Sequence, residues 1–251
     1  MAQLQRLVIT DSQIDQQQIS LTIEQQHYLS RVLRLRSGDQ FIAMNGQGQG
    51  WLASLASDRA HILEPIHAQS ELPISVTLVL ALPKGNGFDE VVRQATELGV
   101  TCIAPVISER TLLNPSANKL ERWRRIVQEA AEQCERQIVP EILDPVSWSD
   151  RLKIESPNSD TCRLICLARG NSPHLLDYLN QAACPSITLA IGTEGGWTDA
   201  EIEMAISANY RPISLGCRVL RAVTAPIVAL SLVAGVVEKV KTEENKTNPS
   251  V

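Results

Sequence analysis

Two glycines follow a glutamate in a segment that joins an apolar run to a helix start. The segment covers residues 191–202 and reads IGTEGGWTDAEI. Glycines after a buried strand let a flat ligand lie against the main chain, because a side chain there would hold the ligand away. Backbone N–H and C=O groups could then read the edge of an adenine. The alternative is that the glycines only form a tight turn into the helix.

The glutamate limits the kind of ligand that this loop can bind. A phosphate cradle is disfavoured, because the carboxylate of Glu194 would repel a phosphate and the chain contains no G-x-x-x-x-G-K-[ST] motif. A second loop of the same type follows the run PISLG, at Gly216-Cys217-Arg218. In an open α/β sheet, ligands bind outside the carboxyl ends of the strands, so both loops could face one ligand.

The elements that must position these loops alternate along the chain. Residues 74–83 form a continuous apolar run, which is typical of a strand buried on both faces. Thr198 and Glu201 form a T-x-x-E capping box, which predicts a helix start at about Asp199. Further strands are expected at residues 100–107, 163–168, 186–192 and 212–216, and helices at 89–99, 118–137 and 225–240. The alternation predicts a parallel α/β sheet with helices on both faces.

The first 70 or so residues have a different, β-rich pattern. Residues 40–56 read QFIAMNGQGQGWLASLA, which predicts a hairpin around an Asn-Gly turn. The turn glycines are not a dinucleotide fingerprint, because their spacing is G-x-G-x-G and no helix follows. Before the hairpin, Arg31, Arg34 and Arg36 alternate with apolar residues as on a strand. Taken alone, these arginines indicate a solvated face rather than a binding surface.

Composition limits the function classes. The 251 residues carry a formal net charge of −5 and are 44% hydrophobic, enough for a sizeable core. A globally basic nucleic-acid binder is excluded, whereas a local basic patch is not. We expect a soluble cytoplasmic protein with no membrane association, because the sequence has no signal-peptide pattern and no uncharged apolar run of membrane-spanning length.

The six cysteines favour reduced thiols and no metal site. No pair has the C-x-x-C spacing of a zinc site. Cys102 and Cys166 lie inside apolar runs, as expected of buried thiols in a reducing compartment. Cys217 follows a glycine in the second loop, and we expect a packed thiol there rather than a covalent catalyst.

Five motifs occur in the order in which one enzyme family carries them. They are LPKGNGFDEVVRQATELGV, ISERT, ERWRRIVQEAAEQC, IGTEGGWTDAEI and SLGCRVLRAVTA. Together with HYLSRVLRLRSGD near the N-terminus, they resemble the ribosomal small-subunit RNA uridine-N3 methyltransferases, the RsmE family of the SPOUT superfamily. The resemblance covers nearly the whole chain except the C-terminal tail.

This resemblance implies a fold and a set of partners. The fold is an α/β SPOUT domain with a deep trefoil knot, preceded by a small PUA-like β-barrel that binds RNA. We therefore expect domains at residues 1–72 and 73–240, followed by a disordered polar tail at 241–251. The family also implies S-adenosyl-L-methionine as methyl donor, a homodimer, and N3 of a uridine in 16S rRNA as target, within an assembled small ribosomal subunit.

The site residues also follow from the resemblance. Arg218 and Arg221 are the catalytic candidates, because methylation at N3 removes a proton and leaves negative charge on the uracil oxygens. Glu194 has two open roles, which are to favour the sulfonium cation or to accept hydrogen bonds from backbone N–H groups. The full set implied for the cofactor is Leu167, Gly192, Glu194, Gly195, Gly196, Leu215, Gly216, Leu220 and Thr224, and for RNA it is Arg31, Arg34, Arg36 and Lys84.

Some residues leave alternatives open. The family glutamate is replaced by Val223, which keeps a non-catalytic RNA-binding or assembly factor as one alternative. A SPOUT enzyme with another RNA target is the other alternative. No histidine lies in the motifs, so Asp89 and Glu97 are the candidates for a general base, although either could only cap or pair on its helix. Trp197 is expected to cover the pocket or to lie in the dimer interface.

Overall fold

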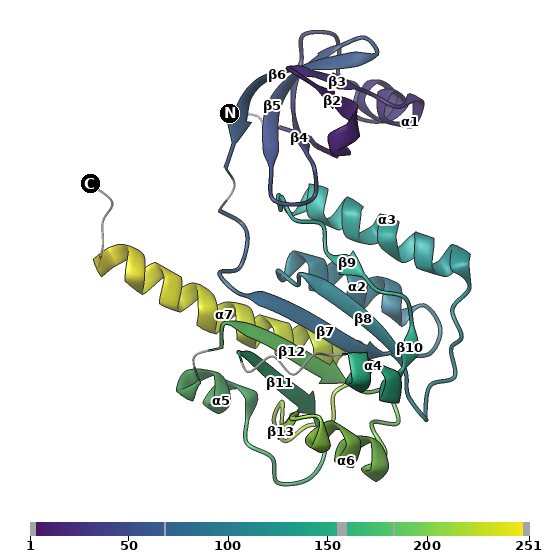
Figure 1. Cartoon of the computed structure of the whole chain (residues 1–251), viewed down its shortest axis with the longest axis vertical. Helices are drawn as coiled ribbons and strands as arrows, with labels where there is room; N and C mark the ends of the chain where they lie inside the picture. The colour runs from purple at the N-terminus through teal and green to yellow at the C-terminus, as the bar shows by residue number, and fades with distance from the viewer. Residues whose placement is uncertain (1–3, 68, 155–159, 183, 248–251) are drawn as a thin grey trace. The chain divides into compact units, whose positions relative to one another are not determined.

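The computed structural model describes residues 4–67, 69–154, 160–182 and 184–247 (Figure 1). The chain divides into two compact units. Residues 1–71 together with 128–139 form the first unit, and residues 72–127 together with 140–251 form the second. The division after residue 71 lies beside the expected boundary at 72, whereas the return of residues 128–139 to the first unit was not expected from the sequence.

The first unit is built on a six-stranded mixed sheet. Its order is β1-β4-β5-β6-β3-β2, in which β1 and β4 are parallel and the other pairs antiparallel. The predicted hairpin is confirmed, and the Asn45 side-chain oxygen accepts from the backbone N–H groups of Gln47 and Gln49 in its turn. The strands are β1 (Arg6–Val8), β2 (Ile14–Asp15), β3 (Gln18–Ser20), β4 (Gln40–Met44), β5 (Gly50–Ala56) and β6 (Arg59–Ile66), with a short 3-10 turn η1 (Asp11–Gln13).

The strand expected around the three arginines is wrong. Helix α1 (Ile23–His27) and the π-helical turn η2 (Tyr28–Val32) occupy this region, and Arg34 follows with a positive φ of 59°. A capping box between Thr22 and Gln25 starts the helix, a signal that the alternating arginines obscured. Leu33 and Leu35 still pack against the core, and Arg31, Arg34 and Arg36 are all exposed.

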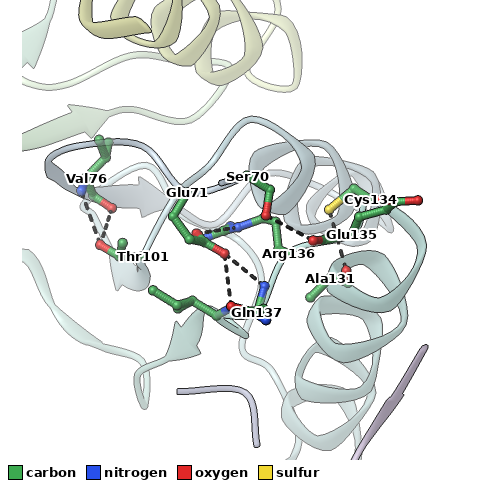
Figure 2. Close-up of polar contacts among 10 residues, drawn as sticks. Ser70, Glu71, Val76, Thr101, Ala131, Cys134, Glu135, Arg136 and Gln137 are labelled. Atoms are coloured by element: carbon green, nitrogen blue, oxygen red, sulfur yellow. Dashed lines mark hydrogen bonds and ion pairs between the residues drawn. The ribbon is translucent and has the colours of Figure 1, made fainter. Parts of the chain in front are cut away.

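The carboxylate of Glu71 helps to hold the returning segment in the first unit. Glu71 Oε2 accepts from Arg136 Nε at 2.9 Å and from Arg136 Nη2 at 2.7 Å (Figure 2). Glu71 Oε1 accepts from the backbone N–H groups of Gln137 and Ile138, both at 3.0 Å. Since Arg136 is only 2% exposed, this ion pair is largely removed from water.

We expect Glu71→Ala to lower the free energy of unfolding by about 3–5 kcal/mol, because it leaves the buried guanidinium of Arg136 without its carboxylate. Urea titration would measure the loss. The control is Glu121→Ala, which breaks the exposed pair with Arg124 and should cost less than about 1 kcal/mol. Equal losses for the two variants would contradict the anchoring role of Glu71.

The second unit is built on a sheet of seven parallel strands, as the sequence predicts. The order is β10-β8-β7-β12-β11-β13, with β9 also paired to β8. Val79 and Ala81 face the cluster around Trp148. Leu78 and Leu80 lie on the opposite face of the sheet and are fully buried, so both faces of the sheet are covered. The strands are β7 (Ser75–Ala81), β8 (Cys102–Ile107), β9 (Glu141–Ile142), β10 (Val146–Ser147), β11 (Thr161–Cys166), β12 (Ser186–Ile191) and β13 (Arg211–Ile213).

Helices follow these strands in two groups. Helix α7 packs against α2 and α5, and α4 packs against α6. The capping box of Thr198 and Glu201 starts α6 at Asp199, as predicted. The bounds are α2 (Gly87–Glu97), α3 (Ala117–Gln133), α4 (Trp148–Ile154), α5 (Leu175–Gln181), α6 (Asp199–Ser207) and α7 (Thr224–Thr247). No helix in the described ranges is long and apolar enough to cross a membrane.

Two details differ from the sequence-based expectations. Helix α7 continues to Thr247, past the expected start of the polar tail at 241, because the lysines and glutamates there are good helix formers. Residues 248–251 lie outside the described residues. Cys162 and Cys184 form a disulfide with a Cα–Cα distance of 5.7 Å, so the expectation of reduced thiols is wrong for this pair. Parallel pairing of β11 and β12 brings the two together, which their wide spacing in the sequence conceals.

Candidate functional site

The glycine loop after β12 folds tightly back on itself. A Cβ atom on Gly192 would lie 3.1 Å from the backbone carbon of Gly196 and 3.2 Å from the nitrogen of Trp197. Gly196 has a positive φ of 70°, which L side chains rarely adopt, and its N–H donates to Thr193 O at 2.8 Å. The Thr193 hydroxyl also accepts from the backbone N–H of Gly195. Gly192 and Gly196 are therefore both required by the course of the backbone.

Glu194 joins this loop to the one that follows β7. Its Oε1 accepts from the backbone N–H of Lys84 at 3.1 Å. Of the two roles left open by the sequence, hydrogen bonding to a backbone N–H is the one that the structure contains. The carboxylate remains exposed and also lines the cavity beside the loop.

That cavity, of about 560 Å³, lies at the carboxyl ends of the strands. Its walls come from the loops after β8, β11, β12 and β13. Nine residues expected at the site line it: Leu167, Gly192, Glu194, Gly195, Gly196, Leu215, Gly216, Arg218 and Leu220. Among the described residues, Arg221 and Thr224 are not part of the lining.

Charge at the cavity differs from charge on the whole chain. Three arginines line it, Arg110, Arg169 and Arg218, against two carboxylates, Glu194 and Asp199. The lining therefore has a formal charge of +1 (three minus two), although the chain has −5. Such a local excess of cations favours a polyanionic substrate.

Arg110 is the site residue that sequence reasoning missed. It follows β8, and its Nη1 donates to the carbonyl oxygens of Gly195 and of Trp197, the latter at 3.3 Å. The motif ISERT contains this arginine, but nothing in the motif indicates which backbone groups it reaches. Arg169, after β11, also lines the cavity and lies in none of the sequence motifs.

Trp197 forms part of the apolar wall. It lines the cavity and is 7% exposed, with its ring centroid 4.7 Å from that of Trp148. Its indole Nε1 is buried and has no hydrogen-bond partner among the described residues. Of the two expected positions, the structure therefore contains the one at the pocket. An acceptor on a bound ligand would satisfy this buried donor.

Comparison with known proteins decides the family. A model of the RNA methyltransferase domain matches residues 70–234, and one of the RNA methyltransferase PUA domain matches residues 21–63. Ribosomal RNA small subunit methyltransferase E of Synechocystis sp. is 50% identical over 238 residues, 93% of this chain and 78% of that protein. The chain belongs to the ribosomal RNA small subunit methyltransferase E (RsmE) family. The resemblance inferred from the motifs is confirmed.

Further relatives agree with this assignment. The Bacillus subtilis protein is 30% identical over 241 residues, covering 90% of this chain and 93% of that one. The crystal structure from Neisseria gonorrhoeae, bound to S-adenosyl methionine, is 30% identical with a TM-score of 0.84, and the match covers 93% and 98% of the two chains. A methyltransferase from Legionella pneumophila, in complex with the same cofactor, has a TM-score of 0.82. These matches confirm the α/β fold with its PUA-like domain, while the trefoil knot stays a prediction.

The catalytic candidates from the RsmE motifs fall in different places. Arg218 is exposed and lines the cavity, whereas Arg221 is exposed outside the lining. Both carboxylate oxygens of Asp89 are used on α3, by Trp123 Nε1 and Arg122 Nε, each at 2.8 Å. Asp89 therefore pairs with α3, which is the structural alternative that the sequence left open for it.

The structure also places the remaining candidate residues. Val223, at the position of the family glutamate, packs so closely on the start of α2 that a Cβ on Gly87 would lie 2.7 Å from its Cγ1. Glu97 is exposed near the end of α2. Lys84 is exposed beside the glycine loop, and Arg31, Arg34 and Arg36 are exposed in the first unit, where side chains can meet phosphates.

The two thiols at the cavity loops should differ in reactivity. Desolvation by burial raises the pKa of the Cys166 thiol to about 12, whereas Cys217 is exposed, which contradicts the expected packed thiol. The thiolate is the reactive form, so we expect iodoacetamide at pH 8 to label Cys217 and to spare Cys166 until unfolding. Peptide mass mapping of native and urea-treated protein would check this. Equal labelling of both thiols in the native protein would contradict the raised pKa of the partly exposed Cys166 thiol.

Proposed function

We propose that this chain transfers the methyl group of S-adenosyl-L-methionine to N3 of a uridine in 16S rRNA of the small ribosomal subunit. The observation that carries the proposal is the glycine-lined cavity at the carboxyl ends of β11, β12 and β13, in a chain of the RsmE family. The Neisseria gonorrhoeae relative was solved with this cofactor bound.

The residues at the cavity fit this cofactor. A volume of about 560 Å³ suits a ligand of its size. No atom lies within 4 Å of where a Cβ on Gly196 would stand, so the main chain there is open to a flat base, and the buried Nε1 of Trp197 supplies a donor that lacks an acceptor. Leu167, Leu215 and Leu220 provide apolar contact, and Glu194 adds negative charge near a sulfonium. Thr224 stays a weaker candidate, since it lies outside the lining.

The reaction requires the protein to position the target base and to stabilise the negative charge that develops on it. The cofactor supplies a methyl group on a positively charged sulfur. Loss of the N3 proton leaves negative charge on two uracil oxygens, and Arg218 at the cavity is placed to stabilise that charge. Arg169 and Arg218 can together hold the base and a neighbouring phosphate in line with the cofactor. Arg221, outside the lining, is the candidate for a more distant contact.

RNA binding is divided between the two domains in this proposal. Residues 1–72 would hold the RNA through Arg31, Arg34 and Arg36, and residues 73–240 would hold the cofactor and the target uridine, with Lys84 beside them. Such contacts position the substrate without reading its sequence. The proposed place of action is the cytoplasm, where ribosomal subunits are assembled.

The second partner in the proposal is a second copy of this chain. Helices α5 and α7 leave a groove of about 430 Å³ between them, lined in part by Leu176, Leu232 and Val236. Leu176 is 36% exposed, and Leu232 and Val236 are partly exposed, so the groove offers an apolar surface to a second copy. Light scattering on the purified protein should give twice the mass of the chain.

Calorimetric titration with S-adenosylmethionine tests the proposal first, with S-adenosylhomocysteine and ATP as controls. We expect the first two to bind and ATP not to bind. Small subunits from a strain that lacks the gene should then gain 3-methyluridine when incubated with protein and cofactor. Cofactor binding with product at another base or RNA would favour a different target. No binding by folded protein would favour the non-catalytic RNA-binding alternative, for which Val223 is the motivating feature.

A further inference from the structure

Arg110 makes contacts that the proposed function leaves unexplained. The residue stands just after β8, two strands away from β12, yet its side chain reaches the glycine loop. There Nη1 donates to the carbonyl oxygens of Gly195 and Trp197. We infer that Arg110 is a positioning residue that holds this loop in its cofactor-binding conformation, an inference that rests on the proposed function.

The loop needs such support because of its composition. Gly195 and Gly196 are adjacent, and glycine loses more conformational freedom than any other residue when it is fixed. Gly195 is also exposed, so core packing does not restrain it. A cation that binds the carbonyls of Gly195 and Trp197, on each side of Gly196, restricts these glycines before the cofactor arrives. Binding then requires less ordering of the loop.

Contacts along the arginine side chain fit the same role. A Cβ atom on Gly195 would lie 2.9 Å from Cδ of Arg110, so the glycine at this position makes room for the arginine stem. A guanidinium nitrogen carries two hydrogens in a fixed plane, which lets Nη1 serve two carbonyls at once. A lysine ammonium at this position would lack that planar geometry and the stem contact.

The backbone beside Arg110 is itself held in place. The neighbouring Glu109 N–H donates to Glu201 Oε1 at 2.8 Å, and Glu201 is only 4% exposed. Glu201 Oε2 accepts from the N–H of Thr198 at 2.9 Å, directly after the glycine loop. The β8 loop is therefore bound to both ends of the segment 195–198, by the Arg110 side chain at one end and by Glu201 at the other. A positioning residue requires a backbone that is itself held in place.

Calorimetry on the full-length protein, with S-adenosylmethionine as the titrant, tests the inference. We expect Arg110→Ala to raise the cofactor Kd by about 10- to 100-fold, the loss that follows when hydrogen bonds to a charged group are removed. The binding entropy should become more unfavourable, because the loop must now be ordered on binding. Arg110→Lys should give an intermediate Kd. The control is Arg211→Ala, which removes an exposed arginine that stacks on Tyr178 outside the cavity and should leave the Kd unchanged.

Steady-state kinetics separates positioning from a direct catalytic or a merely structural role. For a positioning residue, Arg110→Ala should raise KM for the cofactor and change kcat at saturation by less than about threefold. An unchanged Kd and KM would overturn the inference, as would a large fall in kcat with KM unchanged. A rise in Kd matched by a fall in Tm for both Arg110 variants would also overturn it in favour of a folding role. If the wild-type protein itself did not bind the cofactor, the proposed function would fail first.

Discussion

Gly195→Arg should abolish binding of S-adenosylmethionine and leave the fold intact. Gly195 is exposed and its φ is not positive, so its backbone accepts a side chain without strain. The added arginine would enter the cavity, displace Arg110, and place a cation beside a cofactor that carries a sulfonium. We expect the Kd to rise by more than about 1,000-fold, since steric exclusion and repulsion act together. Calorimetry and a thermal melt would measure binding and folding in the same samples.

The matched control for this substitution is Ser207→Arg, which adds the same charge at an exposed position of α6. It should leave both the Kd and Tm unchanged. Gly195→Ala should fall between the two, because its Cβ presses only on the flexible stem of Arg110, at 2.9 Å. Tight cofactor binding by the arginine variant would show that the cofactor site lies elsewhere.

The sequence predicts the second unit well because its signals are local. Apolar runs predicted β7, β8, β11 and β12, and the T-x-x-E pattern placed the start of α6 at Asp199. The glycine loops could be assigned to the carboxyl edge of the sheet before the strand order was known. The sequence shows which segments form the glycine loops, however, and not the distances between them. That is why the cavity lining was predicted largely from family motifs.

Residues that act across long sequence separations escaped prediction. Arg110 lies 85 residues from Gly195, and Glu71 lies 65 residues from Arg136, so neither contact leaves a periodic pattern in the sequence. The disulfide between Cys162 and Cys184 depends on the register of two parallel strands, which the sequence does not specify. In the first unit, the alternation of arginine and leucine suggested a strand, and the capping box at Thr22 was the stronger signal.

Arg218→Ala should reduce kcat for RNA methylation by about 100- to 1,000-fold, the usual loss when a group that stabilises developing negative charge is removed. Arg218 lines the cavity, so its charge can act on the uracil oxygens at the reacting base. The cofactor Kd should change little, because the cationic guanidinium of Arg218 makes no favourable charge interaction with the positively charged sulfonium of the cofactor. Single-turnover rates on small subunits, together with calorimetric Kd values, would separate the chemical step from binding.

Arg221→Ala is the matched control for Arg218→Ala. Both arginines are exposed, carry the same charge and come from the same motif, but Arg221 lies outside the cavity lining among the described residues. If charge at the cavity is what matters, kcat for Arg221→Ala should stay within about tenfold of wild type, and any loss should appear as a higher KM for the subunit. Equal losses in kcat would mean that both arginines act on the reacting base. A large loss for Arg221→Ala alone would place the target uridine on the far side of the β13 loop.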